Sequence, residues 1–338
     1  MLSLSREWAD SGAEVVNFVN VPEGIRIDGK NGGSHSYVPL NIATNVLSNF
    51  EYDVVVAWEC PSVFDNPKIS QNIKLKICEM QVAHLHHDQM RAAEENCDYV
   101  AVLSQWAGEF FVHQGFNYPE RLIILPNGVN LERYQAITEP KKLDLSQNHR
   151  FIYSSSPDRG LWPLLKMWPS IREILPGAQL SVAYGVDKLM EHLKWAHTKQ
   201  GEMAIEVLEL MRQPGVHDLG KIGQKDLADL QMSATGFLYP CDALAPTETG
   251  CISVVENAAA GNPMVLSDCD CLRSEFESFA SIVDLPIEND EWLHDIETIY
   301  NDPVLYEDLS ELGLDFAKTR GWKGISEQWM NLFESHNS

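Results

Sequence analysis

Residues 246–268 have the sequence PTETGCISVVENAAAGNPMVLSD, the most strongly patterned stretch of the chain. Two glutamates, Glu248 and Glu256, lie eight positions apart in it, with Gly250 and a short apolar run between them. Three alanines and Gly261 follow, which is typical of a packed helix and of the glycine that ends it. The letters MVL after them are typical of a buried strand. The stretch therefore predicts a loop, a helix and a strand, with one acid before the helix and one inside it.

The predicted helix begins between Cys251 and Ser253, and its first backbone amides have no partners within the helix. These amides lie at the positive end of the helix dipole, which suits a phosphate or a diphosphate. Gly250 lets the backbone approach such a ligand closely, and Glu248 and Glu256 could flank it. The alternative is one acid that favours the helix dipole and one solvated surface glutamate. The buried stripe of this helix is expected to consist of Ile252, Val255 and Ala259.

Length and composition indicate a globular protein of two domains. The chain has 338 residues, of which 44% are apolar, an ordinary fraction for a folded protein of this size. Its apolar runs fall short of the roughly 18–20 residues that a membrane span needs, and its N-terminus lacks the apolar core of a signal peptide. Seven cysteines without the spacing of a secreted disulfide framework favour reduced thiols. We therefore predict a cytoplasmic protein without a membrane span.

The formal net charge of −24 bears on the choice of partner. Proteins that grip nucleic acid usually neutralise phosphates with clustered lysines and arginines. The strong acidity therefore disfavours broad nucleic-acid binding, although it leaves a local basic groove open.

Apolar runs of strand length alternate with helical patterns along most of the chain. The runs at 52–59 (YDVVVAWE) and 236–240 (GFLYP) are continuous rather than alternating, which favours parallel strands buried on both faces. Ser104 is expected to cap the helix that follows it. The alternation pauses in residues 131–150, where we place a linker. The pattern predicts an α/β protein of two doubly wound domains, with ligands at the carboxyl ends of the strands and hence in an interdomain cleft.

Segment 247–268 resembles the donor-site signature of the retaining GT-B glycosyltransferases of the glycosyl transferase group 1 type. In that family two glutamates at this spacing precede a small-residue helix, Gly-x-Pro and a strand. Five further segments resemble the same template in the same order: 97–116, 121–134, 154–165, 219–241 and 321–333. The resemblance covers residues 93–333 well and the first ninety residues loosely. It implies the GT-B fold, two Rossmann-like domains that face an interdomain cleft.

The resemblance also implies a division of the chain. It gives an acceptor-side domain over 1–138, a linker over 139–149, a nucleotide-sugar-binding domain over 150–318, and a helix over 319–338 that crosses back toward the first domain.

The resemblance assigns roles to individual residues of the donor site. Glu256 would bind the ribose of a nucleotide-sugar donor, and Glu248 would contact the transferred sugar. Arg159 would balance the diphosphate charge, because a guanidinium can bind two phosphate oxygens at once. The remaining donor-site residues would be Gly160, which opens a helix, and Gly250, Cys251 and Ile252, which offer backbone amides.

The basic part of the donor site departs from the family pattern. The family commonly has an arginine and, a few residues on, a Lys-Gly pair, whereas this chain offers only Arg159-Gly160, and Lys166 lies too far along the helix. Either Arg159 takes the roles of both basic residues of the family pattern, or the donor site is weakened. The structural alternative for Arg159 is a surface arginine at a helix end.

The histidine-rich segment 82–89 (VAHLHHDQ) allows three interpretations. His84, His86, His87 and Asp88 could suggest a metal site, but no second ligand group with matching spacing accompanies them, which disfavours metal. The C-x-C of Cys269 and Cys271 is too short to carry a metal site, and we treat the Asp-x-Asp match at 268–270 as chance.

In the resembling family a histidine in this loop contacts the transferred sugar, and His86 or His87 fits that role. A buried structural histidine is the alternative. Gly32-Gly33 forms either a loop that approaches the donor or acceptor, or a plain surface turn.

The resemblance implies transfer of a sugar from a nucleotide-diphosphate sugar to a hydroxyl acceptor, with retention of configuration and without a divalent metal or other cofactor. The acceptor would be a glycan, a lipid or a small molecule. Two alternatives remain open. A non-catalytic GT-B relative that binds nucleotide or sugar as a partner subunit is supported by the reduced basic motif and by a sequence that begins inside the first helix region. A phage-type enzyme that glycosylates DNA bases is disfavoured by the acidity.

Overall fold

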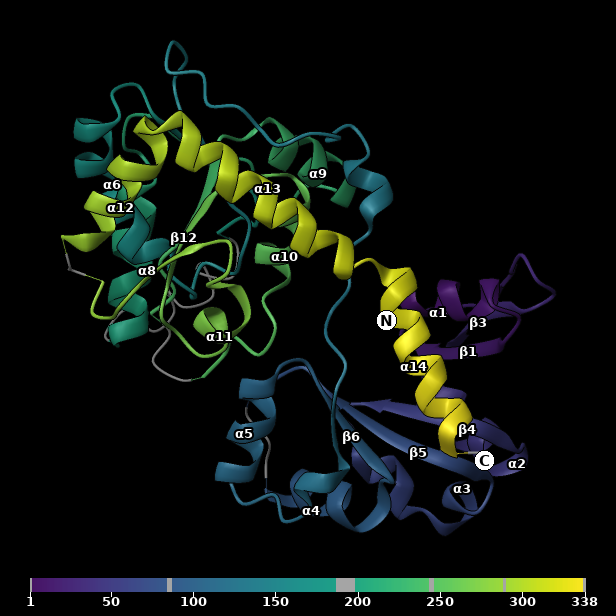
Figure 1. Cartoon of the computed structure of the whole chain (residues 1–338). Coiled ribbons are helices and arrows are strands. Elements are labelled where there is room, and N and C mark those ends of the chain that lie inside the picture. Colours follow the sequence, from purple (N-terminus) through teal and green to yellow (C-terminus); the bar gives the residue numbers. More distant parts are fainter. Residues whose placement is uncertain (1, 84–86, 187–197, 243–245, 288–289, 337–338) are drawn as a thin grey trace. The chain divides into compact units, whose positions relative to one another are not determined.

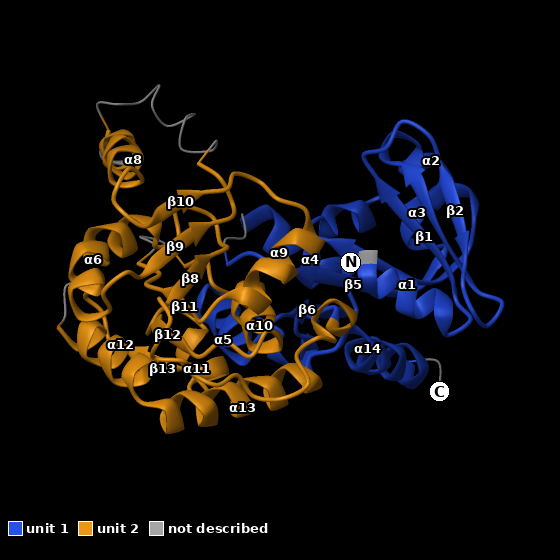
Figure 2. Cartoon of the chain, turned by 90° about the horizontal axis from the view of Figure 1, so that it is seen from above, with its two compact units in different colours: residues 1–130, 320–338 blue, residues 131–319 orange. Residues whose placement is uncertain are grey.

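The computed structural model describes residues 2–83, 87–186, 198–242, 246–287 and 290–336. The chain forms two compact units, which Figure 2 shows in different colours. Unit 1 consists of residues 1–130 and 320–338, and unit 2 of residues 131–319. The segment 139–149, predicted as a linker, belongs to unit 2. Among the helices within the described ranges, none has both the length and the apolar composition needed to cross a bilayer.

Unit 1 contains a parallel sheet of four strands in the order β4-β5-β6-β7 (Figure 1). The strands are β4 (Tyr52–Trp58), β5 (Ile73–Met80), β6 (Tyr99–Val102) and β7 (Leu122–Ile124). In β6, Val100 and Val102 lie in one apolar cluster and Ala101 lies in another, on the opposite face. The sheet is therefore buried on both faces, which is why its strands are continuously apolar in sequence.

Helices cover both faces of this sheet. One face packs against α2 (Ala43–Asn49), α3 (Pro67–Ser70), α4 (His87–Asn96) and α5 (Gln105–His113), with 3-10 turns at η1 (Leu40–Ile42), η2 (Pro61–Asp65) and η3 (Pro119–Arg121). The other face packs against α1 (Leu2–Asp10) and α14 (Trp322–His336). The predicted cap of α5 is confirmed, because Ser104 Oγ accepts the amide of Ala107 at 3.1 Å. The rings of Trp8 and Trp329 lie 5.7 Å apart and join α1 to α14.

Unit 1 also has a three-stranded sheet, in the order β1-β3-β2. Its strands are β1 (Glu14–Val19), β2 (Ile25–Asp28) and β3 (Ser34–Pro39), with β1 parallel and β2 antiparallel to β3. Gly32 and Gly33 lie in the turn between β2 and β3, where the amide of Gly29 donates to the carbonyl of Gly33 at 2.8 Å. A Cβ at Gly33 would lie 2.4 Å from the carbonyl oxygen of Ala9. The turn therefore packs closely against the end of α1.

Unit 2 contains a six-stranded sheet in which every neighbouring pair is parallel. Its strands are β8 (Arg150–Tyr153), β9 (Gln179–Val182), β10 (Val216–Asp218), β11 (Gly236–Tyr239), β12 (Met264–Ser267) and β13 (Ser281–Val283). The spatial order is β10-β9-β8-β11-β12-β13. Counted along the chain this is 3-2-1-4-5-6, the order of a doubly wound dinucleotide-binding fold. The order reverses between β8 and β11.

The reversal sends the two sets of crossover helices to opposite faces of the sheet. Helix α6 packs on α8, and α10 packs on α9 and α13. Within the described residues, unit 2 has the helical elements η4 (Leu131–Tyr134), α6 (Leu161–Ile174), α8 (Lys199–Leu210), α9 (Gln224–Ser233), α10 (Ile252–Ala259), α11 (Leu272–Phe276), α12 (Glu291–Asn301) and α13 (Pro303–Thr319).

Lys141 fixes the chain that enters unit 2. Its Nζ donates to the carbonyls of Ala234 at 2.7 Å and Gln231 at 3.3 Å and to the side chain of Asn262. Residues before β8 are therefore bonded into the core of unit 2.

Candidate functional site

Two loops of unit 2 meet where its strand order reverses. Residues 154–160 follow β8 and lead into α6, and residues 240–251 follow β11 and lead into α10. Because β8 and β11 are neighbours in the sheet, both loops leave its carboxyl edge side by side. In open parallel sheets this is the place where ligands bind.

Gly160 brings these two loops into contact. It has a φ of 115° and stands at the N-cap of α6. A Cβ at this position would lie 2.3 Å from the carbonyl oxygen of Pro240. Only glycine combines this backbone angle with so close an approach. The start of α6 is therefore held against the loop that follows β11.

Helix α10 begins at the same edge. Its first residue is Ile252, its N-cap is Cys251, and Gly261 follows it with a φ of 68°, so both predicted ends are confirmed. The hydroxyl of Ser253 donates to the carbonyl of Ser154 at 3.0 Å and ties the first turn to the loop after β8. The predicted stripe was partly wrong, because Ile252 is 38% exposed.

Glu248 and Arg159 form an ion pair across the two loops. The Oε1 atom of Glu248 accepts from Arg159 Nη1 at 3.0 Å and from the hydroxyl of Tyr239 at 2.8 Å. Glu248 is buried, with a side chain only 1% exposed, whereas the side chain of Arg159 is 37% exposed. Burial is the largest single influence and works to lower the pKa of Arg159, but Glu248 and three further neighbouring groups together outweigh it and raise that pKa overall.

Asp270 holds the backbone beneath Glu248. It has a φ of 51°, uncommon for a residue other than glycine. Its Oδ2 accepts the amide of Thr247 at 2.7 Å and the amide of Glu248 at 2.9 Å. The amide of Cys271 in turn donates to the carbonyl of Glu248 at 3.2 Å. The letters Asp-Cys-Asp, which sequence reasoning set aside as a chance match, thus include a residue that shapes the site.

Glu256 lies at the end of a buried relay. The hydroxyl of Tyr134 donates to Gln231 Oε1 at 2.6 Å, and Gln231 Nε2 lies 3.4 Å from Glu256 Oε2. Burial raises the pKa of Glu256, while the Gln231 hydrogen bond and the charge of Arg133 act to lower it. The carboxylate is thus oriented from η4 and α9, two elements distant in sequence.

Two hydroxyls at the site lack partners. Within the part of the chain that the structure describes, Ser154 Oγ and Thr247 Oγ1 are buried and have no hydrogen-bond partner. Ser154 begins the loop after β8 and Thr247 precedes Glu248. Buried polar groups in native proteins are nearly always bonded, so a ligand that supplies polar atoms at this edge would complete the site.

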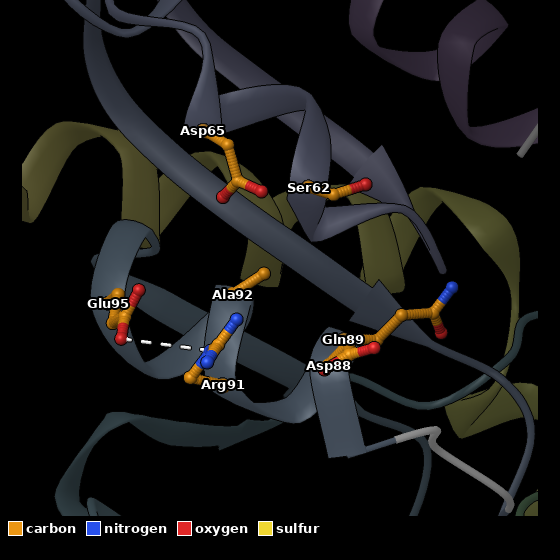
Figure 3. Close-up of a pocket in the computed structure, with 7 residues that line it drawn as sticks. All are labelled: Ser62, Asp65, Asp88, Gln89, Arg91, Ala92 and Glu95. Atoms are coloured by element: carbon orange, nitrogen blue, oxygen red, sulfur yellow. Dashed lines mark ion pairs between the residues drawn. The ribbon is translucent and has the colours of Figure 1, made fainter.

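Of the predicted histidines, His87 alone lies within the described residues. His86 lies outside the described residues, as does His84, and His87 is the exposed first residue of α4 in unit 1. Beside it, α4 and η2 line a cavity of about 220 Å³ (Figure 3). Three carboxylates line this cavity, and its arginine, Arg91, lies 4.0 Å from one of them, Glu95. The excess of negative charge does not suit a phosphate.

The potential metal ligands and the cysteine thiols have structural roles. Among the described residues, no three histidine, cysteine or acidic side chains are placed to hold a metal ion. All seven cysteines are free thiols. Cys251 and Cys271 are buried near Glu248, and burial, with a further contribution from the charge of Glu248, raises the pKa of both thiols.

Solved structures share this architecture over nearly the whole chain. A sucrose-phosphate synthase from Thermosynechococcus elongatus matches with a TM-score of 0.72 at 16% identity, over 98% of this chain and 91% of that one. HepE from Anabaena, in complex with UDP and glucose, matches with a TM-score of 0.71 at 15% identity, over 99% and 95%. These neighbours are GT-B glycosyltransferases. The fold is GT-B.

A further GT-B neighbour is TarM from S. aureus, in complex with fondaparinux, alpha-GlcNAc-glycerol and UDP. It matches with a TM-score of 0.64 at 16% identity, over 92% of this chain and 64% of TarM. The sequence itself matches no protein-family model and no curated protein. At such identities the GT-B fold is established, and the chemistry has to be argued from the residues of the site.

In this GT-B chain the structure brings together five of the predicted site residues at one edge of unit 2. They are Arg159, Gly160, Glu248, Gly250 and Cys251, with Ile252 and Glu256 on the adjoining helix. Sequence reasoning missed Asp270, Tyr134, Gln231 and Tyr239. No spacing rule links these four to the two glutamates, because each reaches the site from a different element.

Proposed function

We propose that this chain is a glycosyltransferase that moves a sugar from a nucleotide-diphosphate sugar to a hydroxyl acceptor with retention of configuration. The observation that carries the proposal is the meeting of Arg159 with the starts of α6 and α10 at the strand reversal of unit 2. Neighbours with the same fold were solved with UDP or UDP-glucose. The acceptor would be a glycan, a lipid or a small hydroxyl compound.

The diphosphate would be bound by one guanidinium and by helix amides. Arg159 is half-exposed, and only one of its nitrogens is engaged by Glu248. An arginine has five N–H donors in a planar fork, so further donors remain for phosphate oxygens. The first amides of α10, beside Gly250 and Cys251, add the partial positive charge of a helix start.

The nucleoside would be recognised through Glu256. Its carboxylate lies on α10, one turn beyond the amides that face the diphosphate. A carboxylate accepts hydrogen bonds from both hydroxyls of a ribose. The relay from Tyr134 through Gln231 fixes its position before the ligand arrives, so little side-chain freedom is lost on binding.

Catalysis would depend on stabilising the leaving group. As the bond from the sugar to the diphosphate breaks, negative charge grows on the phosphate oxygens, where Arg159 and the α10 amides would face it. The acceptor hydroxyl would attack from the face that the diphosphate leaves. No divalent metal and no resident cofactor has a role in this proposal. His86 and His87 are proposed as contacts to the transferred sugar.

A second candidate function is a subunit that binds nucleotide or sugar without transfer. The position of Lys166 favours this candidate. Its Nζ lies 4.4 Å from the ring centre of Trp162, with which it makes a cation–π contact. Arg159 would then carry the diphosphate without help from the second basic residue that the resemblance leads one to expect.

Thermal shift with UDP, GDP, ADP and their glucose conjugates tests the proposed function. A ligand at a hundredfold excess over its Kd stabilises the folded state by about 2.7 kcal/mol. We expect one nucleotide and its glucose conjugate to raise the thermal midpoint of the wild type. The same ligands should leave the midpoints of Arg159→Ala and Glu256→Ala unchanged. Release of labelled glucose to water or to an acceptor separates an enzyme from a binding subunit. If none of the nucleotides stabilises the wild type, the proposal is wrong.

A further inference from the structure

We infer that Glu248 is a positioning residue that anchors Arg159 for the diphosphate, rather than a direct ligand of the transferred sugar. The inference rests on the proposed function, and it assigns to Glu248 a role different from the sugar contact that the resemblance implies. It follows from the burial, the hydrogen bonds and the charge of the two side chains.

The burial of the two partners differs sharply. The side chain of Glu248 is 1% exposed and that of Arg159 is 37% exposed. A sugar at the edge of the sheet can therefore reach the guanidinium but has almost no access to the carboxylate. The carboxylate is enclosed by protein, and the guanidinium is partly open to solvent.

The hydrogen bonds at Glu248 are directed inward. Its Oε1 accepts from Arg159 Nη1 and from Tyr239, which are 3.0 Å and 2.8 Å away. The Tyr239 hydroxyl is fixed in turn by Ser155 Oγ at 3.0 Å. With two donors bound, Oε1 has its lone pairs occupied, and the burial of the side chain limits the access of a sugar hydroxyl to Oε2.

Charge explains why the pair persists. A carboxylate taken out of water is costly unless it is paired and hydrogen-bonded, and Arg159 supplies the pairing charge for Glu248. Each partner restrains the other, because a long arginine side chain bound through one nitrogen loses most of its freedom before the ligand arrives. The remaining N–H donors then present a fixed fork to the phosphate oxygens.

The backbone of Glu248 is held as firmly as its side chain. Asp270 accepts its amide at 2.9 Å, and Cys271 donates to its carbonyl at 3.2 Å. The arrangement suits an anchor that must not move when Arg159 receives a diphosphate.

The test measures the Kd of UDP, which has no sugar, and of UDP-glucose by calorimetry. GDP or ADP and its glucose conjugate replace them if thermal shift shows that nucleotide to bind. We expect Glu248→Ala to weaken UDP binding by about tenfold, because Arg159 becomes mobile. Glu248→Gln should stay within about threefold of the wild type, since its amide oxygen still accepts from Arg159 and Tyr239. In an Arg159→Ala background, Glu248→Ala should have no further effect on UDP.

Two outcomes would overturn the anchor role. One is a Glu248→Ala variant that binds UDP normally and loses affinity only for UDP-glucose, which is the behaviour of a sugar contact. The other is an undiminished effect of Glu248→Ala in the Arg159→Ala background. If the wild type binds no nucleotide, the proposed function fails, and that failure is distinct from both.

A second variant and a matched control complete the design. Glu248→Asp keeps the charge and withdraws the carboxylate by one methylene, so it should weaken UDP binding even if Glu248→Ala does not fold. Glu14→Ala breaks an exposed pair in unit 1, where Arg26 Nη2 lies 3.3 Å from Glu14 Oε1. This control should leave the affinity for UDP unchanged.

Discussion

Asp270 holds Glu248 by its backbone, with Asp270 Oδ2 2.9 Å from the amide nitrogen of Glu248. The same oxygen accepts the amide of Thr247, so a single carboxylate sets the course of the loop. Asp270 adopts a φ of 51°, in the left-handed region of the backbone. The site of unit 2 is thus shaped by a residue of the next βα connection, which lies beyond β12.

Replacing Asp270 tests this support. Asp270→Ala removes two hydrogen bonds to a charged acceptor, worth about 1.5–3 kcal/mol each, and leaves a left-handed backbone that alanine disfavours. We expect the thermal midpoint to fall by roughly 5–10 °C and nucleotide binding to weaken. Asp270→Asn, which keeps one acceptor oxygen and tolerates the backbone angle, should lose less than half as much. Equal losses for Ala and Asn would contradict the role of the hydrogen bonds.

Gly160 tests the contact between the two loops. Gly160→Ala places a Cβ 2.3 Å from the carbonyl oxygen of Pro240 at a φ of 115°, so we expect a loss of about 2–4 kcal/mol in the free energy of unfolding. Chemical denaturation measures it. Gly115→Ala is the matched control, because Gly115 has a φ of 101° and no atoms within 4 Å of the added Cβ. A loss at Gly160 no larger than at Gly115 would mean that the loops separate freely.

Tyr134 tests the relay to Glu256. Tyr134→Phe leaves Gln231 Oε1 without its buried donor, which costs about 1–3 kcal/mol of stability and loosens the amide that faces Glu256. We expect severalfold weaker binding of nucleoside diphosphates and unchanged binding of inorganic pyrophosphate, which has no ribose. Tyr118→Phe, at an exposed position in unit 1, is the control. If Tyr134→Phe weakened the binding of pyrophosphate as much as that of nucleoside diphosphates, the residue would not act through ribose recognition.

Lys141 is expected to make the stability of the protein depend on pH. Burial, with a smaller contribution from Arg150, lowers the pKa of Lys141 to about 7, against about 10.4 in an unfolded chain. Between these values the unfolded state holds a proton that the folded state releases, so the contribution of Lys141 to stability rises with pH, by up to about 1.4 kcal/mol per unit. The oxygens around Nζ oppose this shift because they favour the charged form.

The measurement compares the wild type with Lys141→Met from pH 6 to pH 10. We expect the wild type to gain thermal stability relative to the variant above pH 7. A constant difference across this range would show that the oxygen acceptors keep Lys141 charged.

Local patterns were sufficient for much of the fold. The continuous apolar runs predicted parallel strands buried on both faces. The run at 236–240 forms β11 and confirms this, whereas the run at 52–59 forms β4, a parallel strand at the sheet edge that is mostly only partly buried. Ser104 and Gly261 marked helix ends that the structure places as predicted. The hairpin of β2 and β3 was missed, because β3 is stabilised by its pairing with β1 on one side and with β2 on the other rather than by an apolar pattern of its own.

The sequence by itself determined which helix begins beside Glu248, that Glu256 lies inside it, and that Arg159 opens another helix. These are local properties, set by backbone preferences and apolar spacing over a few residues. Only the tertiary structure decided that Arg159 and Glu248, 89 positions apart, would pair, and that Asp270, Tyr134 and Gln231 would support the two glutamates. The strand order brings these residues together, and strand order depends on how all six strands of unit 2 pack at once.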